Sequence, residues 1–348
     1  MQDLVLRKVS LKNTEERHEV NRFLETFGLS LDNDVDYTVA LRNTRGDIKA
    51  TCSKSRNVFK CFAVSEEIRG ENVTSSLIST LIDQSFEEQI FHNFVFTKLD
   101  KVNIFTALNF KIVYEVKNAA LLEYGVIDIH RYLDDIASKY SITPTLPKGA
   151  LVMNCNPFTK GHRFLVEEAS KSCEQVLLFV VEEDKSLFPF KYRYEIVKDS
   201  VKDLKNVTVI SGGEYIISSA TFPSYFLRKE DERLKAYEHM DCGIFGKYFC
   251  SKFNITKRFV GQEPYCQLTN TYNNTLHEIM PKYGVQLIEI ERKKYSGGYI
   301  SASIVRELIK NNKLAEVEEI VTEATWRFLN SDEGKEIIER IKLSNSQH

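Results

Sequence analysis

Two short sequences in this chain combine residue types that bind phosphate. The first, Thr159-Lys-Gly161-His162, follows the apolar run 150–153 and a turn that contains proline. Gly161 lets the backbone come close to a phosphate. The helix that begins there directs free N–H groups and the positive end of its dipole at the anion. This order predicts a phosphate site at a strand-to-helix turn, where the Thr159 hydroxyl and the His162 imidazole hydrogen-bond phosphate oxygens.

The second sequence lies near the end of the chain, where Ser301 and Ser303 open a helical segment and Arg306 follows about one turn later. Two hydroxyls and the free N–H groups of a helix start suit a polyphosphate. By itself, the motif is more simply interpreted as a capping serine and a solvated arginine. Together with the first motif, it favours a nucleotide-phosphate site.

The segments around these motifs indicate how they are positioned. After residue 150, β-type apolar runs alternate with long amphipathic segments, which predicts an α/β fold with a parallel, Rossmann-like sheet covered by helices on both faces. The chain ends in a helical region. The predicted strands lie at 176–181, 207–210, 258–260 and 285–290.

The segment 141–149 contains two prolines and a glycine, so we place a domain boundary there. We expect residues 1–140 to form a separate α+β domain. Residues 148–348 should form the Rossmann-like domain with its helical carboxyl terminus. In the first domain we expect strands at 37–42, 47–52, 58–64 and 94–97 and a helix at 69–89.

The amino-acid composition limits the kinds of molecule that the chain is expected to bind. The chain has 348 residues, of which 43% are hydrophobic and 28% charged, and its formal charge of -2 argues against electrostatic binding of nucleic acid. It shows neither a membrane-spanning apolar run nor a secretory signal, so we expect a cytoplasmic protein that does not bind membranes. The seven cysteines are dispersed, which predicts reduced thiols and no protein metal site.

Several motifs together identify a family. The Thr-x-Gly-His and Ile-Ser-x-Ser-x-x-Arg sequences resemble the nucleotidylyltransferase superfamily. A closer resemblance, to the citrate lyase ligases, extends over nearly all of the second domain. It is carried by the segments 154–162, 181–190, 213–227, 261–264 and 300–306.

The resemblance implies an ATP-dependent ligase. Acetate would attack the α-phosphate of ATP, giving acetyl-AMP and pyrophosphate. The thiol of the CoA-like prosthetic group on the acyl-carrier subunit of citrate lyase would then take the acetyl group, releasing AMP and activating the lyase. Acetate is already ionised at neutral pH, so positioning and charge neutralisation should dominate catalysis. Mg²⁺ is expected to be bound mainly through the ATP phosphates.

The resemblance also assigns roles to residues. Thr159 and His162 would contact the α- and β-phosphates, and Ser301, Ser303 and Arg306 the leaving pyrophosphate. Three basic residues are candidates for charge stabilisation: Lys185, Lys191 and Arg193. The remaining expected ATP contacts are Asn154, Asn156, Pro157, Phe158 and Gly161 in the first turn, and Gly261 and Glu263 in a later loop near the adenosine.

The first domain resembles the GNAT acetyltransferases at Arg69-Gly70-Glu-Asn72-Val-Thr74, although Asn72 and Thr74 stand where that family's acyl-CoA-binding turn has small residues. Backbone N–H groups contact the pyrophosphate of CoA at such turns. We expect this domain to dock the prosthetic group of the carrier subunit. A working N-acetyltransferase is the alternative.

Two other functions remain open from the sequence. One is an adenylyltransferase that uses a different acceptor, of the phosphopantetheine or nicotinamide mononucleotide type. The other is a nucleotide-sensing regulatory protein that binds ATP without turnover. Dependence of the reaction on acetate distinguishes the ligase from both.

Overall fold

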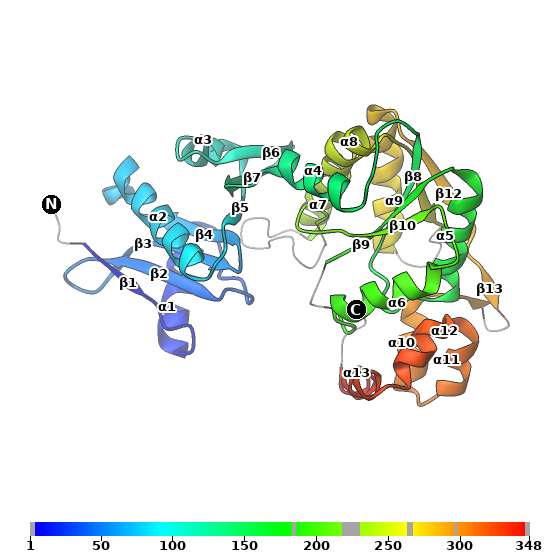
Figure 1. Cartoon of the computed structure of the whole chain (residues 1–348). Coiled ribbons are helices and arrows are strands. Elements are labelled where there is room, and N and C mark those ends of the chain that lie inside the picture. Colours follow the sequence, from blue (N-terminus) through cyan, green and yellow to red (C-terminus); the bar gives the residue numbers. More distant parts are fainter. Residues whose placement is uncertain (1–3, 183–185, 218–229, 263–266, 296–297, 345–348) are drawn as a thin grey trace. The chain divides into compact units, whose positions relative to one another are not determined.

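The computed structural model of the chain describes residues 4–182, 186–217, 230–262, 267–295 and 298–344 (Figure 1). The chain divides into two compact units, Met1–Tyr132 with Phe222–Met240, and Leu133–Thr221 with Asp241–His348. The first division falls within helix α4 (Ile129–Lys139), and the proline-containing segment 141–149 leads directly into strand β8 (Lys148–Met153).

The first unit contains a seven-stranded mixed sheet in the order β1-β2-β3-β4-β5-β7-β6, in which β4 and β5 are parallel and the other pairs antiparallel. The predicted strands are all present. Their bounds are Val5–Lys8, Tyr37–Arg42, Ile48–Ser55, Val58–Val64, His92–Thr97, Lys111–Val116 and Ala119–Gly125 for β1 to β7.

Helix α2 (Glu71–Glu87), which the sequence predicted at 69–89, packs on this sheet. Its Leu77, Ile78 and Leu81 are buried in one cluster with side chains of β2 to β5 and β7. The other helices of the unit are α1 (Thr14–Glu25), α3 (Val102–Thr106) and the short 3₁₀ turns η1 (Glu66–Ile68) and η2 (Leu99–Lys101). The unit therefore has the α+β character expected from its sequence.

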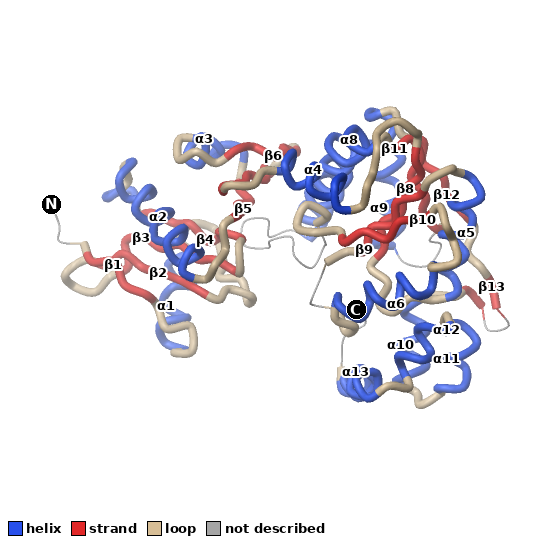
Figure 2. The backbone as a smooth tube through the Cα atoms, viewed as in Figure 1, coloured by secondary structure: helices blue, strands red, loops and turns tan. Residues whose placement is uncertain are grey.

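The second unit is built on a five-stranded parallel sheet in the order β10-β9-β8-β11-β12 (Figure 2). The remaining bounds are Val176–Val180 for β9, Val207–Ser211 for β10, Ile255–Gly261 for β11 and Gln286–Ile290 for β12. The chain moves outward from β8 to β10 and then returns to the other side of β8 at β11. The carboxyl ends of β8 and β11 therefore form the topological switch point, where ligands bind in open α/β sheets.

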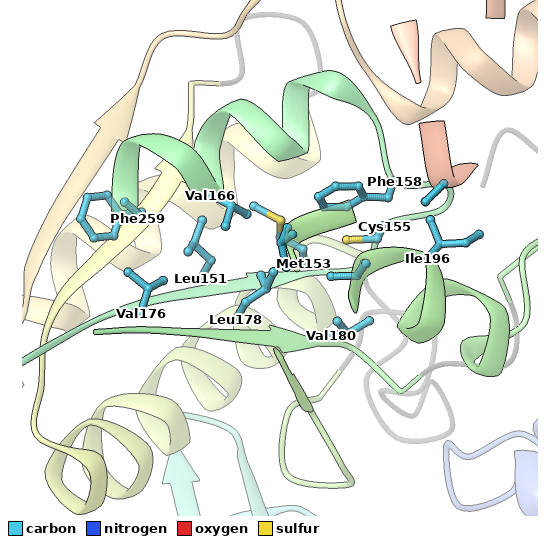
Figure 3. Packing of buried hydrophobic residues seen from close by; sticks show 14 residues of the cluster. Leu151, Met153, Cys155, Phe158, Val166, Val176, Leu178, Val180, Ile196 and Phe259 are labelled. Carbon is cyan, nitrogen blue, oxygen red and sulfur yellow. The ribbon is translucent and has the colours of Figure 1, made fainter. Parts of the chain in front are cut away.

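Helices cover both faces of this sheet. On one face, α5 (Lys160–Ser172) and α6 (Phe190–Val201) bury Val166 and Ile196 against Leu151 and Leu178 of β8 and β9 (Figure 3). On the other face, Phe179 of β9 packs against aromatic rings of a π-helix, η3 (Phe245–Cys250), and of α8 (Ser251–Phe253). The predicted Rossmann-like fold class is confirmed.

The remaining elements link β10 to β11, β11 to β12 and β12 to the end of the chain. They are α7 (Glu230–Ile244), α9 (Gln267–Ile279), η4 (Met280–Tyr283), β13 (Lys294–Tyr295), β14 (Gly298–Tyr299), α10 (Ala302–Lys310), α11 (Leu314–Ile320), α12 (Glu323–Leu329) and α13 (Asp332–Leu343). Helix α7 belongs to the first unit up to Met240 and to the second unit from Asp241 onward. The last four helices share an apolar cluster that includes Ile300 and Val305. Within the described residues, no helix combines the length and apolar character needed to cross a membrane.

Candidate functional site

The first motif forms the strand-to-helix turn that its sequence predicted. Strand β8 ends at Met153, and helix α5 begins after Thr159, which is the N-cap residue with an extended backbone. The Thr159 Oγ1 accepts the backbone N–H of His162 at 3.2 Å, and the His162 Nδ1 accepts the N–H of Thr159 at 3.1 Å. This reciprocal capping box fixes the position of the imidazole at the helix start.

The hydrogen bond from Thr159 also fixes the tautomer of His162. Because Nδ1 accepts the Thr159 N–H, the ring proton of the neutral imidazole lies on Nε2. Burial, with a smaller contribution from Arg292, lowers the pKa of His162 from 6.5 to about 4. The ring also stacks on Phe158, with 5.5 Å between ring centroids. His162 is therefore a neutral, oriented hydrogen-bond donor at physiological pH.

In the structure, Thr159 caps helix α5 and orients His162, which differs from the predicted phosphate contact. Its side chain is 1% exposed, and its hydroxyl lies 3.0 Å from the His162 Nδ1 while it caps α5. The hydroxyl is therefore already used within the protein. Thr159 orients the histidine, which leaves the His162 Nε2 and the N–H groups of the first turn of α5 outside this hydrogen bonding.

The second motif lies next to the first in space. A Cβ atom added to Gly161 would lie 3.1 Å from the Ile300 carbonyl oxygen, so the absence of a side chain at Gly161 allows this close approach. Ile300 directly precedes Ser301, which caps α10 by accepting the Ile304 N–H at 3.2 Å. The first turns of α5 and α10 are thus brought together, as the pairing of the two motifs predicted.

Arg306 joins the two motifs directly. Its side chain is 7% exposed, and its Nη1 donates to the Asn156 carbonyl at 2.5 Å while its Nη2 donates to the Ser303 Oγ at 3.3 Å. The sequence predicted a pyrophosphate contact for Arg306. In the structure this guanidinium ties α10 to the turn before α5, whereas Ser303 is exposed at the start of α10.

Arg193 likewise supports the turn from inside the fold. It is fully buried, and its guanidinium donates to the carbonyls of Phe188, Asn154 and Val181 at distances between 2.6 and 2.9 Å. These carbonyls lie at or beyond the carboxyl ends of β8 and β9. The predicted charge stabilisation of the substrate by Arg193 is thus replaced by a structural role, because its donors face the protein backbone.

The other residues of the turn differ in exposure. Asn156, Pro157 and Phe158 are buried, and the Asn156 Oδ1 accepts the N–H of Phe188 at 3.0 Å. Thr325 of α12 donates to the Phe158 carbonyl at 2.7 Å. Asn154 is exposed, with its Nδ2 3.1 Å from the Ser186 Oγ. Of the predicted ATP contacts in this turn, Asn154 is therefore the side chain that remains accessible.

Three further predicted residues lie around the turn. Lys191 is exposed in the first turn of α6, with its Nζ 5.7 Å from the centre of the Tyr192 ring. Gly261 ends β11 at the switch point, where an added Cβ would lie 3.3 Å from Leu165 of α5. Lys185 and Glu263, which the sequence also predicted, lie outside the described residues.

Arg292 is a site residue that sequence reasoning missed. It follows the carboxyl end of β12, its Nε donates to the Gln262 carbonyl at 2.7 Å, and its charge contributes to the low pKa of His162. It lies in the basic run Arg292-Lys-Lys294, a pattern typical of a solvated surface segment. The usable signal was its location directly after the last strand of a parallel sheet, where ligand-binding residues gather.

Cys155 is excluded as a nucleophile. Its side chain is 1% exposed and lies in the apolar cluster between β8, α5 and α6 (Figure 3). Burial raises the pKa of the Cys155 thiol to about 12, so the reactive thiolate is not formed near neutral pH.

The predicted docking turn of the first unit has a different character. Gly70 is the N-cap residue of α2 with an extended backbone, and no described side chain caps this helix. Arg69 and Asn72 are exposed, and the Arg69 Nη1 lies 3.6 Å from Glu66. Thr74 is half-buried. The turn thus places an exposed arginine beside a helix start that no described side chain caps.

The order of the parallel sheet and the paired helix starts at its switch point define a Rossmann-like α/β domain, joined to an α+β unit. Sequence comparison agrees with this class and narrows it. A profile of the family described as the citrate lyase ligase C-terminal domain matches residues 148–329. With the relatives described next, this match shows that the chain belongs to the citrate lyase ligase family, and it is an enzyme.

The chain is similar over nearly its whole length to curated [citrate [pro-3S]-lyase] ligases. The protein of Escherichia coli K12 is 33% identical over 332 residues, which cover 93% of each chain. That of Klebsiella pneumoniae is 32% identical over 94% of this chain and 96% of its own. That of Haemophilus influenzae is 34% identical over 89% of this chain and 94% of its own.

Solved structures show weaker likenesses. A bifunctional NMN adenylyltransferase/ADP-ribose pyrophosphatase of Francisella tularensis covers 58% of this chain and 53% of its own, at 15% identity and a TM-score of 0.35. FeeM, an N-acyl amino acid synthase from uncultured soil microbes, covers 36% of this chain and 92% of its own, at 14% identity and a TM-score of 0.32. The family assignment follows from the sequence relatives.

Proposed function

We propose that this enzyme acetylates the thiol of the CoA-like prosthetic group on the acyl-carrier subunit of citrate lyase, and so activates the lyase. The reaction uses ATP and acetate, passes through acetyl-AMP, and releases pyrophosphate and AMP. The observation that carries the proposal is the convergence of two helix starts and a neutral histidine at the switch point of the parallel sheet, in a chain of the citrate lyase ligase family.

The first step requires little acid–base chemistry. An acetate oxygen attacks the α-phosphorus as the bond to the bridging oxygen of pyrophosphate breaks, and both reactants are already in their reactive ionisation states. The His162 Nε2–H would donate to an α-phosphate oxygen, and the N–H groups of α5 would stabilise the charge that develops there. Because the pKa of His162 is low, the imidazole stays neutral and donates a hydrogen bond without taking up a proton.

The leaving pyrophosphate would lie at the start of α10. The start of α10 lies next to the start of α5, and Ser303 in its first turn is exposed, so the two helix starts would hold adjacent phosphates. Arg292 and Lys191 are the cations that we assign to the triphosphate. We place the adenosine beside Gly261 and Gln262, where β11 ends.

Magnesium would enter with ATP. Within the described residues, no group of three or more histidine, cysteine, aspartate or glutamate side chains is arranged to hold a metal ion. We therefore expect phosphate oxygens and water molecules to be the main ligands of the ion. The amide oxygen of the exposed Asn154 is a further candidate ligand. The ion would neutralise charge on the β- and γ-phosphates.

We assign the two steps to the two domains predicted from the sequence. Residues 148–348 would form acetyl-AMP, and residues 1–140 would dock the prosthetic group at the turn around Gly70. The open N-terminus of α2 supports this role, since its N–H groups suit the phosphates of a CoA-like group.

The test is pyrophosphate release by the full-length protein with ATP and Mg²⁺, measured with and without acetate and the thiol form of the carrier subunit. Release that requires acetate, with turnover increased by the carrier, is expected. Release that proceeds without acetate but requires a phosphorylated acceptor would contradict the proposal, and so would ATP binding without any release.

A further inference from the structure

A buried carboxylate in the second unit joins segments that follow two different strands of the sheet. Asp241, at the end of α7, is 4% exposed. Its Oδ1 accepts the N–H of Ile217 at 2.9 Å, and its Oδ2 accepts the Tyr272 hydroxyl at 2.5 Å. Ile217 lies beyond β10, whereas Tyr272 lies on α9, beyond β11. One side chain therefore clamps the segments at the carboxyl ends of β10 and β11.

A second buried charge accompanies this clamp. Arg258 of β11 is 2% exposed and lies with its guanidinium 4.7 Å from the centre of the Phe245 ring. Its Nε and Nη1 have no hydrogen-bond partner among the described residues. Burial raises the pKa of Asp241 to about 6, while the Tyr272 hydrogen bond and the Arg258 charge act in the opposite direction. Two buried charges contribute less stability than apolar side chains of similar size, so stability alone does not account for them.

The backbone beside the clamp is also unusual. The π-helix Phe245–Cys250 begins directly after α7 and places Phe245 against Arg258. Next to Phe245, Gly246 allows close packing of Tyr283, because an added Cβ would lie 2.2 Å from the Tyr283 ring. Short π-helices are rare and frequently lie at functional sites. The π-helix and the two buried charged side chains, Asp241 and Arg258, are separate observations in the same region of the fold.

The clamped segment follows β10, on the half of the sheet away from the proposed adenosine contacts. The proposed ATP contacts at Gly261 and Arg292 lie beyond β11 and β12. The segment 212–217 lies beyond β10, and it begins against β9, where the Gly212 N–H donates to the Val180 carbonyl at 2.8 Å. With the phosphates held over β8, the ends of β9 and β10 remain for the acceptor.

We propose that Asp241 is a positioning residue for acetate: by clamping Ile217 to Tyr272, it holds the segment 212–217 where the small carboxylate substrate binds. Asp241 itself contacts protein groups and not the reacting atoms. The inference rests on the proposed function, because it takes acetate as the acceptor. It predicts that loss of the clamp weakens acetate binding far more than ATP binding.

The experiment compares KM values in acetate-dependent pyrophosphate release by the full-length protein and its variants. In Asp241→Ala, the KM for acetate should rise on the order of tenfold, as expected for loss of charge-assisted hydrogen bonds, with the KM for ATP changed less than about twofold. Asp241→Asn keeps an acceptor for the Ile217 N–H and should recover most of the loss. Tyr272→Phe, which removes one clamp contact, should show a smaller shift of the same kind.

Asp199→Asn is the matched control, since Asp199 pairs at the surface with Lys202 and Arg327, away from the clamp. Its two KM values should not change. If Asp241→Ala does not fold, Tyr272→Phe decides the question. Equal shifts in both KM values, or a lower melting temperature with unchanged KM values, would overturn the positioning role. No acetate-dependent release by the unaltered protein would instead overturn the proposed function.

Discussion

The start of helix α5 was predicted to bind the phosphates of ATP and the start of α2 to dock a prosthetic group, and the protein builds the two helix starts in different ways. The α5 start is enclosed: Gly161 packs against Ile300, and Arg306 reaches the preceding turn from a position 150 residues further along the chain. At the α2 start, a Cβ added to Gly70 would meet nothing within 4 Å, and the Arg69 ion pair is local. An enclosed site suits adenylyl transfer, whereas an open one suits a prosthetic group that arrives on another protein.

His162→Ala should give the largest effect. It removes the oriented Nε2 donor at the enclosed site, so kcat/KM for acetate-dependent pyrophosphate release should fall on the order of 100- to 1,000-fold. The melting temperature should also fall by a few degrees, because the variant loses the acceptor for the Thr159 N–H. His162→Gln, which retains a neutral donor, should lose less. Full activity of the alanine variant would remove His162 from the mechanism.

Arg306→Met should act mainly through stability. The variant loses the donor to the Asn156 carbonyl, and we expect the free energy of unfolding to fall by about 2 kcal/mol, as for a buried hydrogen bond from a charged group. Urea denaturation measures this. Arg69→Gln, at the open turn, should change stability by less than about 0.5 kcal/mol. Similar losses of unfolding free energy in the two variants would contradict the difference between the enclosed and the open helix start.

Gly161→Val and Gly70→Ala compare the two helix starts sterically. The added atoms at Gly161 collide with Ile300, so the starts of α5 and α10 should separate and the rate should fall on the order of tenfold or more. Gly70 has an extended backbone and open space around it, so its variant should keep the acetate-dependent rate. Equal tolerance at both glycines would show that the two helix starts do not act together.

Arg69→Glu tests the proposed docking turn. Reversal of this exposed charge should raise the KM for the carrier subunit on the order of tenfold while ATP–pyrophosphate exchange stays unchanged. Lys117→Glu, the same charge change at an exposed site in the same unit, is the control. An unchanged carrier KM in Arg69→Glu would remove this turn from the docking surface.

The pH dependence of His162 gives the smallest expected effect. Its pKa of about 4 lies below the ordinary value of 6.5, so the unfolded chain binds more protons between these pH values. The stability from this group is thus complete above about pH 6.5 and is lost as the pH falls toward 4. Denaturation at pH 7 and pH 5 should show a larger drop for the unaltered protein than for His162→Gln, and the reaction rate should show no imidazole titration between pH 6 and 8.

The sequence predicted much of the enclosed site because local patterns specify it. The apolar run before Thr159, the capping residues and Gly161 are adjacent in the chain, and they fold as the strand, turn and helix that this order favours. The pairing of this turn with the Ser301 motif was also predicted, although it spans a long separation in sequence.

The roles of Thr159, Arg193 and Arg306 were not predictable in the same way. Their residue types suggest contacts with phosphate, but packing buries them and directs their polar atoms to the turn itself. Burial depends on the tertiary fold, which the residue type and the local pattern do not specify. Arg292 and Asp241 were missed for the same reason: their partners come from other elements.

The most direct test of the account is ATP–pyrophosphate exchange in the absence of the carrier subunit, measured with and without acetate for the unaltered protein and for His162→Ala. The account predicts exchange that requires acetate and falls on the order of 100-fold or more in the variant. Exchange that proceeds without acetate, or that the variant supports at the full rate, would contradict it.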